Sequence, residues 1–236
     1  MTNTILNKVN PHSHLSTLAY SILNHHQTER DNFDISKMLI EFGARSYYGE
    51  TDEQKDFSPI FMAVQKLNQE LLELMCDHGA SLTVKNSIGM TPLMFAAEQN
   101  YQIIVNYLSL RTRDLNEEDS NSITILVHQL FSNNLRMASR LIVRGAKIDY
   151  VNRNGNTALH LCVENKLKEA VEFLLFKGAN PHIMDLKGED ACDKAKANGM
   201  AKLIPVFNNC SINKKVLPLL PNGRHAVVKE LPTFLK

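Results

Sequence analysis

The sequence predicts an all-α solenoid, in which about six helix–turn–helix units stack in chain order and short β-hairpin-like loops connect them. Three markers that share one period support this prediction. The first is a three-residue block that opens with a helix-capping residue, as in Thr91-Pro92-Leu93. This opening residue recurs every 33 positions, at Thr91, Thr124, Thr157 and, more weakly, Ser58, and one further step of 33 reaches Asp190. A fixed period in the range of 20–50 residues is the sequence signature of a repeat architecture.

Glycine provides the other two markers. A Gly-Ala pair begins 21 positions after the opening residue in three units, at Gly79, Gly145 and Gly178. Another glycine stands two positions before an opening residue at Gly89, Gly155 and Gly188. Because three independent markers keep the same phase, the repeat is a property of the fold and not a coincidence of composition.

Each marker has a physical reason. Thr91 caps a helix whose first turn accepts Pro92, since the missing N–H of proline has no intrahelical partner there. The second helix of a unit shows apolar residues at helical spacing, as at Ala170 and Phe173. Gly178 supplies the left-handed end of that helix. A helix pair of this kind cannot bury both of its apolar faces alone, so it must stack on its neighbours.

These residues resemble the ankyrin-repeat family, whose unit reads approximately D-x-x-G-x-T-P-L-H-x-A-A, then a second helix, then G-A-D. The best matches are the segments 86–97 and 152–160, and the resemblance covers about residues 17–207. It implies that a protein partner lies along the concave face, formed by hairpin tips and first-helix surfaces. It also implies that His160 hydrogen-bonds and orders the turn between repeats and does not act as a general base.

The phase divides the chain into an N-terminal segment 1–16, the solenoid 17–207 and a C-terminal tail 208–236. The units are expected near residues 17–57, 58–90, 91–123, 124–156, 157–189 and 190–207. The first unit is irregular, because Gly43 follows its opening residue Thr17 after 26 positions, whereas the spacing is 21 in the later units. We expect the five additional residues in a longer inter-helix loop through 26–32. Unit four should pack most loosely, since 127–129 replace small alanines. In unit six, Lys194 should lie on the polar outer face of a capping repeat.

The tail after Phe207 has a different character. It contains Pro218, Pro221 and Pro232, which exclude a long helix, and it carries more basic than acidic residues. Its apolar pairs distinguish it from low-hydrophobicity disorder. We expect an extended segment that docks either on this solenoid or on a partner.

The composition excludes several classes of function. Of the 236 residues, 44% are hydrophobic and 22% charged, and the net charge of +1 gives no general attraction to nucleic acid. Apolar stretches fall short of the ~20 residues that a membrane span needs. The four cysteines show no C-x-x-C spacing, and residues 1–15 do not have the apolar core of a signal peptide. We therefore expect a cytoplasmic protein with reduced cysteines.

No constellation in the sequence predicts catalysis, a cofactor or a metal site. The histidines at 12, 14, 25 and 26 lack the additional ligands that a metal centre requires, so we interpret them as solvated. The sequence has no phosphate-binding loop or nucleophile elbow. It predicts a non-catalytic protein–protein interaction module that acts as a scaffold, adaptor or assembly subunit. The alternative is a regulatory inhibitor or host-directed effector that blocks a target with the solenoid or the tail.

Candidate contact residues follow from the phase of the repeat. Phe57, Met90 and Ile123, each directly before an opening residue, form an apolar ladder to which Ile88 adds. The ladder is either a contact patch or a set of side chains covered by neighbouring hairpins. The acidic residues 117–119 are interpreted as a solvated turn in preference to a site for a basic partner. The other candidates are Gln65, Lys66, His78, Glu98, Gln99, Arg111, Phe131, Arg144, Arg153, Asn156, Glu164 and Lys177.

Overall fold

The structure, a computed structural model, describes residues 7–10, 15–23, 29–47, 55–200, 205 and 207. This part of the chain forms α-helices joined by turns and hairpin-like loops, and its one isolated β-bridge pairs Val9 with Ser16. The chain divides into an N-terminal module (residues 1–113 and 118–121) and a C-terminal module (114–117 and 122–236). The all-α solenoid class predicted from the sequence is confirmed. The C-terminal tail and the histidines at 12, 14, 25 and 26 lie outside the described residues.

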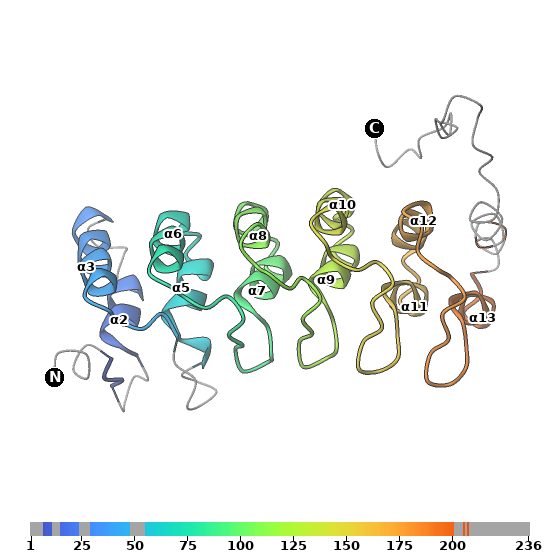
Figure 1. The fold of residues 1–236 in the computed structure, drawn as a ribbon, viewed down its shortest axis with the longest axis horizontal. Coiled ribbons are helices and arrows are strands. Elements are labelled where there is room, and N and C mark those ends of the chain that lie inside the picture. Colours follow the sequence, from blue (N-terminus) through green and yellow to red (C-terminus); the bar gives the residue numbers. More distant parts are fainter. Residues whose placement is uncertain are drawn as a thin grey trace, which may run out of the picture. The chain divides into compact units, whose positions relative to one another are not determined.

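The N-terminal module contains three helix pairs. They are α2 (Thr17–Leu23) with α3 (Glu29–Glu41), α5 (Pro59–Gln65) with α6 (Gln69–Asp77), and α7 (Pro92–Glu98) with α8 (Gln102–Ser109). The first helices α2, α5 and α7 lie side by side in one row, and the second helices α3, α6 and α8 form another (Figure 1). Each pair therefore packs on the next through both of its helices.

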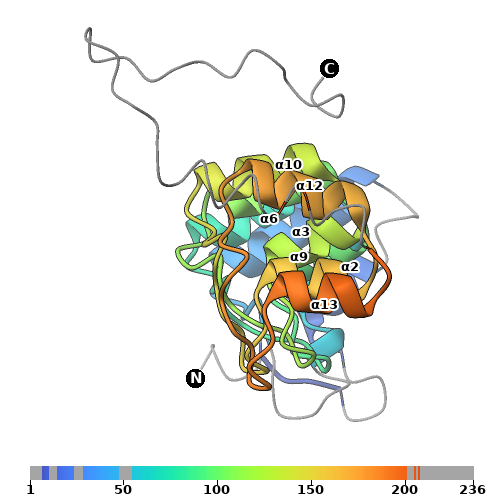
Figure 2. The same ribbon diagram turned by 90° about the vertical axis from the view of Figure 1, so that its right-hand side faces the viewer.

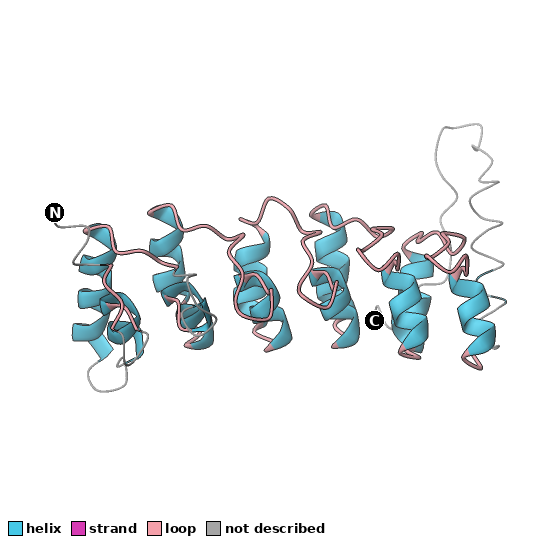
Figure 3. Cartoon of the chain, turned by 90° about the horizontal axis from the view of Figure 1, so that it is seen from below, coloured by secondary structure: helices cyan, strands magenta, loops and turns pink. Residues whose placement is uncertain are grey.

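The C-terminal module repeats this arrangement. It contains α9 (Ile125–Phe131) with α10 (Leu135–Val143), α11 (Ala158–Glu164) with α12 (Lys168–Phe176), and α13 (Ala191–Ala197). Helix α11 packs between α9 and α13. The hairpin loops extend past these first helices, on the side away from α10 and α12 (Figure 2). Figure 3 shows the same loops in pink between the cyan helices.

Three of the opening residues, Thr91, Thr157 and Asp190, cap first helices with their side chains, whereas Ser58 and Thr124 stand at the N-cap position without a side-chain cap hydrogen bond. The Thr91 hydroxyl accepts a hydrogen bond from the Met94 N–H at 3.3 Å, and the Asp190 carboxylate accepts one from the Asp193 N–H at 2.8 Å. In the first repeat the cap is Ser16, whose hydroxyl accepts from the Ala19 N–H at 3.0 Å. Thr17, which the sequence suggested as the opening residue, is the first residue of the helix.

The first repeat differs from its expected form in the second helix. Helix α3 has 13 residues, whereas α6 has nine. It begins at Glu29, so residues 29–32, which were expected in a loop, belong to a helix. The extra length of this repeat is thus partly helical.

The turn between the two helices of a repeat contains a periodic position that the sequence analysis missed. Its backbone is left-handed, with φ between 52° and 73° at Leu67, Asn100, Asn133, Lys166 and Gly199. Glycine and asparagine adopt this conformation readily, whereas leucine and lysine pay a steric cost of roughly 1–2 kcal/mol. Because the residue types vary, the residue pattern gave no signal of the turn.

The four hairpin loops that the structure describes in full begin at an Asn or Asp whose side chain accepts hydrogen bonds from backbone N–H groups of the loop. Asn152 Oδ1 accepts hydrogen bonds from the N–H groups of Asn154 (3.0 Å) and Asn156 (2.9 Å). Asp119 is the equivalent residue in the N-terminal module, where its carboxylate accepts from the Asn121 N–H at 2.8 Å. Glu118 and Asp119 are both buried. The interpretation of 117–119 as a solvated turn is therefore wrong, because these side chains belong to the hairpin framework.

A column of small residues lines the first helices, and one member departs from it. Here a column means the residues at one position in successive repeats. Gln129 is completely buried, and neither its amide nitrogen nor its amide oxygen has a hydrogen-bond partner. The other members are Ala63, Ala96, Cys162 and Ala195. The loosest packing, which the sequence predicted for repeat four, stays a prediction; what the structure shows there is an unsatisfied buried amide.

We expect Gln129→Met to stabilise the protein. Methionine keeps the approximate volume of glutamine and removes two buried polar groups, each of which costs about 1–3 kcal/mol when unsatisfied. The free energy of unfolding, measured by urea denaturation, should rise by at least about 1 kcal/mol. The exposed Gln65→Met is the matched control and should be nearly neutral. A destabilised Gln129→Met protein would contradict this account.

Two glycines of the C-terminal module share the same backbone conformation, but only one of them lies in close contact with a neighbouring residue. Gly155 (φ 78°) and Gly188 (φ 78°) both have left-handed backbones. A Cβ atom on Gly155 would lie 2.5 Å from Cγ and 2.9 Å from the backbone N of Leu186, whereas a Cβ on Gly188 would meet nothing within 4 Å. The hairpin at Gly155 is therefore pressed against the next hairpin.

Both Gly155→Ala and Gly188→Ala should lose stability through the left-handed backbone, at roughly 1–2 kcal/mol. Gly155→Ala should lose about 1–3 kcal/mol more, because its methyl group overpacks the contact with Leu186. Thermal and urea unfolding of the two variants measure the difference. Equal losses would show that the hairpins are free to separate.

Candidate functional site

The ends of the first helices expose polar candidates in the N-terminal module. Gln65 lies at the end of α5, and Glu98 and Gln99 lie at the end of α7; all three side chains are exposed. Lys66, which follows Gln65, is half-buried. In the C-terminal module, Phe131 ends α9 and is half-buried. Hence these positions remain accessible to a partner while their chemistry changes from repeat to repeat.

The ends of the second helices carry a basic column. A cation at a helix C-terminus is favoured by the helix dipole. The Arg111 guanidinium lies 4.1 Å from the centre of the Tyr107 ring, and the Lys177 ammonium lies 5.7 Å from that of Phe173. These contacts hold the cations in place. The column consists of His78, Arg111, Arg144 and Lys177.

Arg111 also lines a groove of about 460 Å³ in the N-terminal module. The groove lies between the C-terminal turns of α6 and α8, where Cys76 and Thr112 also line it. Arg113, absent from the sequence candidates, adds a second guanidinium. A signal was present in the sequence, because Thr112-Arg113 stands where other repeats have Gly-Ala.

The apolar ladder is only partly exposed. Met90 is 3% exposed, so the second interpretation of the ladder, a side chain covered by the hairpins, holds for this residue, and Met90 is not an accessible contact residue. Its backbone N–H donates to Asn86 Oδ1 at 2.8 Å, which closes the hairpin with the side chain inside. Ile123 is half-buried, whereas Phe57 and Ile88 are exposed. The hairpins thus cover one member of the ladder and leave others accessible.

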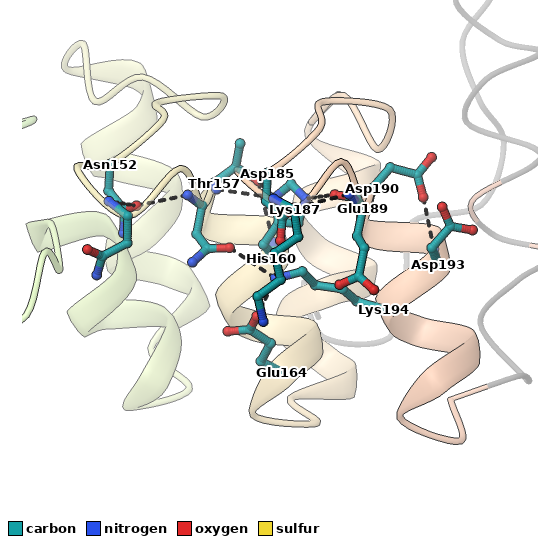
Figure 4. Close-up of polar contacts among 12 residues, drawn as sticks. Asn152, Thr157, His160, Glu164, Asp185, Lys187, Glu189, Asp190, Asp193 and Lys194 are labelled. Carbon is teal, nitrogen blue, oxygen red and sulfur yellow. Dashed lines mark hydrogen bonds and ion pairs between the residues drawn. The ribbon is translucent and has the colours of Figure 1, made fainter.

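In the C-terminal module the buried Lys194 hydrogen-bonds two of the candidate contact residues, Asn156 and Glu164. Lys194 Nζ donates to the Glu164 carboxylate and lies 2.8 Å from Asp185 Oδ2 (Figure 4). It also donates to Asn156 Oδ1 at 3.1 Å. Lys194 is buried, so its assignment to the outer face of a capping repeat is wrong. The lysine points into the preceding repeat because three oxygen ligands are available there. Arg153 remains exposed.

The charges of this cluster stabilise one another. Burial lowers the pKa of Lys194, but its hydrogen bonds to Asp185 and Glu164 outweigh burial and leave the pKa above its usual value. Lys194 in turn holds the pKa of the Asp185 carboxyl below its usual range, together with the backbone N–H groups of the hairpin. The cluster joins α13 to α11 through a charged network.

His160 stands beside this cluster and orders the turn, as the family resemblance implies. The Thr157 N–H donates to His160 Nδ1 at 3.2 Å, and the Nε2 of the ring lies 3.3 Å from the Glu189 carbonyl oxygen. Since Nδ1 accepts, Nε2 carries the proton and donates to that carbonyl. Burial is the main cause that lowers the pKa of His160. The neutral ring is therefore a structural bridge between two repeats.

This bridge should make stability depend on pH. The folded pKa of His160 lies below its ordinary value of 6.5, so the unfolded chain binds more protons between the two values. The stabilisation is complete above pH 6.5 and is lost as the pH falls toward the lowered pKa. Glutamine at this position retains the capping-box geometry without titrating. Melting temperatures at pH 7.5 and 5.5 should fall less for His160→Gln than for the wild type; equal falls would refute this role.

The described residues offer no evident reactive centre. They contain no group of three or more His, Cys, Asp or Glu side chains that could hold a metal ion. Burial raises the pKa of the Cys162 thiol to about 12, so this thiol is a poor nucleophile. Within the described part, no helix has the length and apolar character to cross a membrane.

The geometry defines a protein of stacked helix pairs joined by hairpins. A family profile described as ankyrin repeats (three copies) matches residues 25–119 and 104–185. The chain belongs to the ankyrin-repeat family. Ankyrin repeats are general protein–protein interaction modules, and their fold is generally non-catalytic.

Two curated relatives show the extent of the similarity. Alpha-latrotoxin-Lg1a of Latrodectus geometricus is 31% identical over 120 residues, which are 49% of this chain and 9% of that protein. The ankyrin repeat protein FPV031 of Fowlpox virus (strain NVSL) is 34% identical over 106 residues, 44% of this chain and 31% of that protein. The matched region thus spans 9% of the first relative and 31% of the second.

One relative is an enzyme by name, and solved ankyrin repeat domains have a similar fold. The phosphocholine transferase AnkX of Legionella pneumophila is 24% identical over 107 residues, 44% of this chain and 11% of that protein. The ankyrin repeat domain of Bcl-3, a member of the IkappaB protein family, superposes with a TM-score of 0.71 at 20% identity and covers 86% of each chain. This likeness supports the fold alone.

Proposed function

We propose that this chain is a non-catalytic interaction module that binds another protein through its first-helix ends and hairpins. One observation carries the proposal: apart from Gln129, the columns that pack between repeats keep small or apolar residues, whereas the column at the ends of the first helices varies. Stacking restricts the buried positions. The exposed positions are free of that restriction, so they can match the surface of a partner.

The exposed columns show this variation in both modules. The column at the end of the first helices changes from Gln65 to Glu98 in the N-terminal module, and from Phe131 to Glu164 in the C-terminal one. Arg153 and the exposed Phe57 and Ile88 add a cation and two apolar side chains on the hairpin side. Mixed polar, charged and apolar chemistry of this kind suits a protein surface as the ligand.

Two neighbouring candidates have a second role in this proposal. Asn156 and Glu164 hydrogen-bond Lys194, so they contribute to the fold as well as to the surface. Met90 is left out of the binding surface because it is buried.

A binding function of this kind suits several roles in the cell. We favour a scaffold, adaptor or assembly subunit in the cytoplasm, where cysteines without pairing spacings stay reduced. The tail 208–236 would dock on the repeats or on the partner. A protein that blocks its target would need the tail for inhibition, so deletion of 208–236 separates the two roles.

Capture of partners on the immobilised full chain tests the proposal. Quantitative mass spectrometry of extracts from the cells that produce the protein should find partners that the wild type retains. The double variant Gln65→Arg/Glu98→Arg should retain at least about tenfold less, equivalent to about 1.4 kcal/mol. The control Glu70→Arg changes an exposed residue in the first turn of α6 and should retain partners normally.

Two results would count against the proposal. One is the absence of any retained protein, and the other is an equal loss in the double variant and the control. Circular dichroism of each variant shows whether the helices are intact.

A further inference from the structure

The third repeat has an arginine just after its second helix, at a position where the other described repeats have alanine. The alanines of this column are Ala44, Ala80, Ala146 and Ala179. Two of them, Ala146 and Ala179, are only 5% and 1% exposed, so stacking keeps the position small elsewhere. Arg113 is exposed. An exposed arginine in this column does not serve the stacking, and departures from a local rule are expected at functional sites.

The backbone at the end of α8 explains this exposure. At the end of α6, Gly79 has a left-handed backbone with a φ of 82°. At the equivalent position after α8, the backbone of Thr112 is not left-handed, because that conformation is costly for a β-branched residue. The Thr112 N–H instead donates to the Leu108 carbonyl at 2.9 Å, as in a continued helical turn. The chain therefore leaves α8 by a different path, with Arg113 at the surface.

The second cation of this region, Arg111, is held in place by an aromatic ring. Its guanidinium lies 4.1 Å from the centre of the Tyr107 ring, and Tyr107 is only 6% exposed. A guanidinium that stacks by its face keeps N–H donors at its edge, where they can bind both oxygen atoms of one carboxylate. Arg111 and Arg113 line the same groove, which we call the arginine groove. Its lining also includes Cys76, Asp77, Ser81, Thr83 and Thr112.

The carboxylates near the arginine groove do not neutralise these cations. Asp77 lines the groove, but among the described residues no ion pair joins a carboxylate to Arg111 or Arg113. Glu73 accepts a hydrogen bond from a side-chain amide of its own helix. Asp114, the next residue after Arg113, accepts hydrogen bonds from N–H groups two residues later. The lining of the groove thus carries two unpaired cations against one anion.

A second groove, of about 470 Å³, continues the arginine groove toward the first repeat. The two grooves share Ala80 and Ser81 in their lining. Arg45 and Glu41 line the second groove, so the two together present three guanidiniums and two carboxylates. They extend across the ends of α3, α6 and α8. This length suits an extended peptide and exceeds what a single small anion needs.

We propose that an acidic segment of a protein partner binds in the arginine groove, where its carboxylates pair with Arg111 and Arg113. Arginine clusters recognise acidic motifs in this way, through bidentate hydrogen bonds. The inference rests on the proposed function, because it takes the ligand to be a protein, and it adds a second contact surface at the ends of the second helices. The small excess of positive charge favours a peptide over nucleic acid, whose binding takes many phosphate contacts.

Fluorescence anisotropy of the full chain with a synthetic peptide tests this proposal. The probe is a fluorescein-labelled peptide of about ten residues, alternating glutamate and serine, which reaches ~33 Å when extended. The chain should bind it at low ionic strength, and a peptide with glutamine in place of glutamate should not bind. Arg113→Ala, which restores the residue of the other repeats, should raise the dissociation constant at least about threefold. Arg111→Gln/Arg113→Ala should raise it at least about tenfold.

Two further variants separate the groove from the general charge of the molecule. The matched control is Arg136→Gln/Arg140→Ala, which removes two exposed cations of α10 outside the groove and should leave binding nearly unchanged. Asp77→Asn removes the carboxylate of the groove, and it should lower the dissociation constant about twofold because a like charge is lost.

Three results would overturn the proposal. The first is a wild type that does not bind the glutamate peptide at up to about 500 µM. The second is equal weakening in the arginine variant and the control, since only net charge would then matter. The third is a DNA oligonucleotide that binds more tightly than the peptide and depends on the same arginines.

Circular dichroism shows whether each variant keeps its helices. Should the double variant lose them, Arg113→Ala alone decides the result, because alanine is the residue that stacking accepts at this position. Partner capture through the first-helix ends uses other residues and cell proteins as ligands, so either proposal can fail without the other.

Discussion

The structure depends on one constraint: a short helix pair has apolar side chains on two sides and can bury both only between neighbours. The helices of the second to fifth repeats have seven to nine residues. Isolated helices of this length are not stable in water. Ala63 and Ala96 show the result in the N-terminal module, where both side chains are completely buried. The caps, left-handed turns and hairpins keep the pairs in a register that allows this burial.

The sequence predicted the elements that stacking restricts. The opening residues and the Gly-Ala pairs recur because caps and left-handed helix ends accept few residue types. The left-handed turns were missed, since Leu67 and Lys166 give no sign of a positive φ. Lys194 was misplaced because a lysine is usually solvated, and only the folded structure shows the oxygen atoms of Asn156, Glu164 and Asp185 that surround it.

The candidate surface was less predictable than the fold for a related reason. The phase of the repeat identifies equivalent positions, but exposure depends on what each neighbour covers. Met90 is inside its hairpin, whereas Phe57 at the equivalent position is exposed. Arg111 stacks on Tyr107, a contact that needs the three-dimensional arrangement of α8. The sequence therefore identifies which positions are equivalent in successive repeats, but it does not show which of these side chains are exposed to a partner.

The last described helix, α13, is attached in a way that affects how the array opens. Its buried residues are Ala191, Cys192, Lys194 and Ala195, so it places little apolar area against α11 and depends on the charged network around Lys194. Detachment of this helix would expose little surface, and both the heat capacity change and the denaturant dependence of an opening scale with exposed surface. Local release of α13 is consequently an opening with a small denaturant dependence, so urea should promote it only weakly.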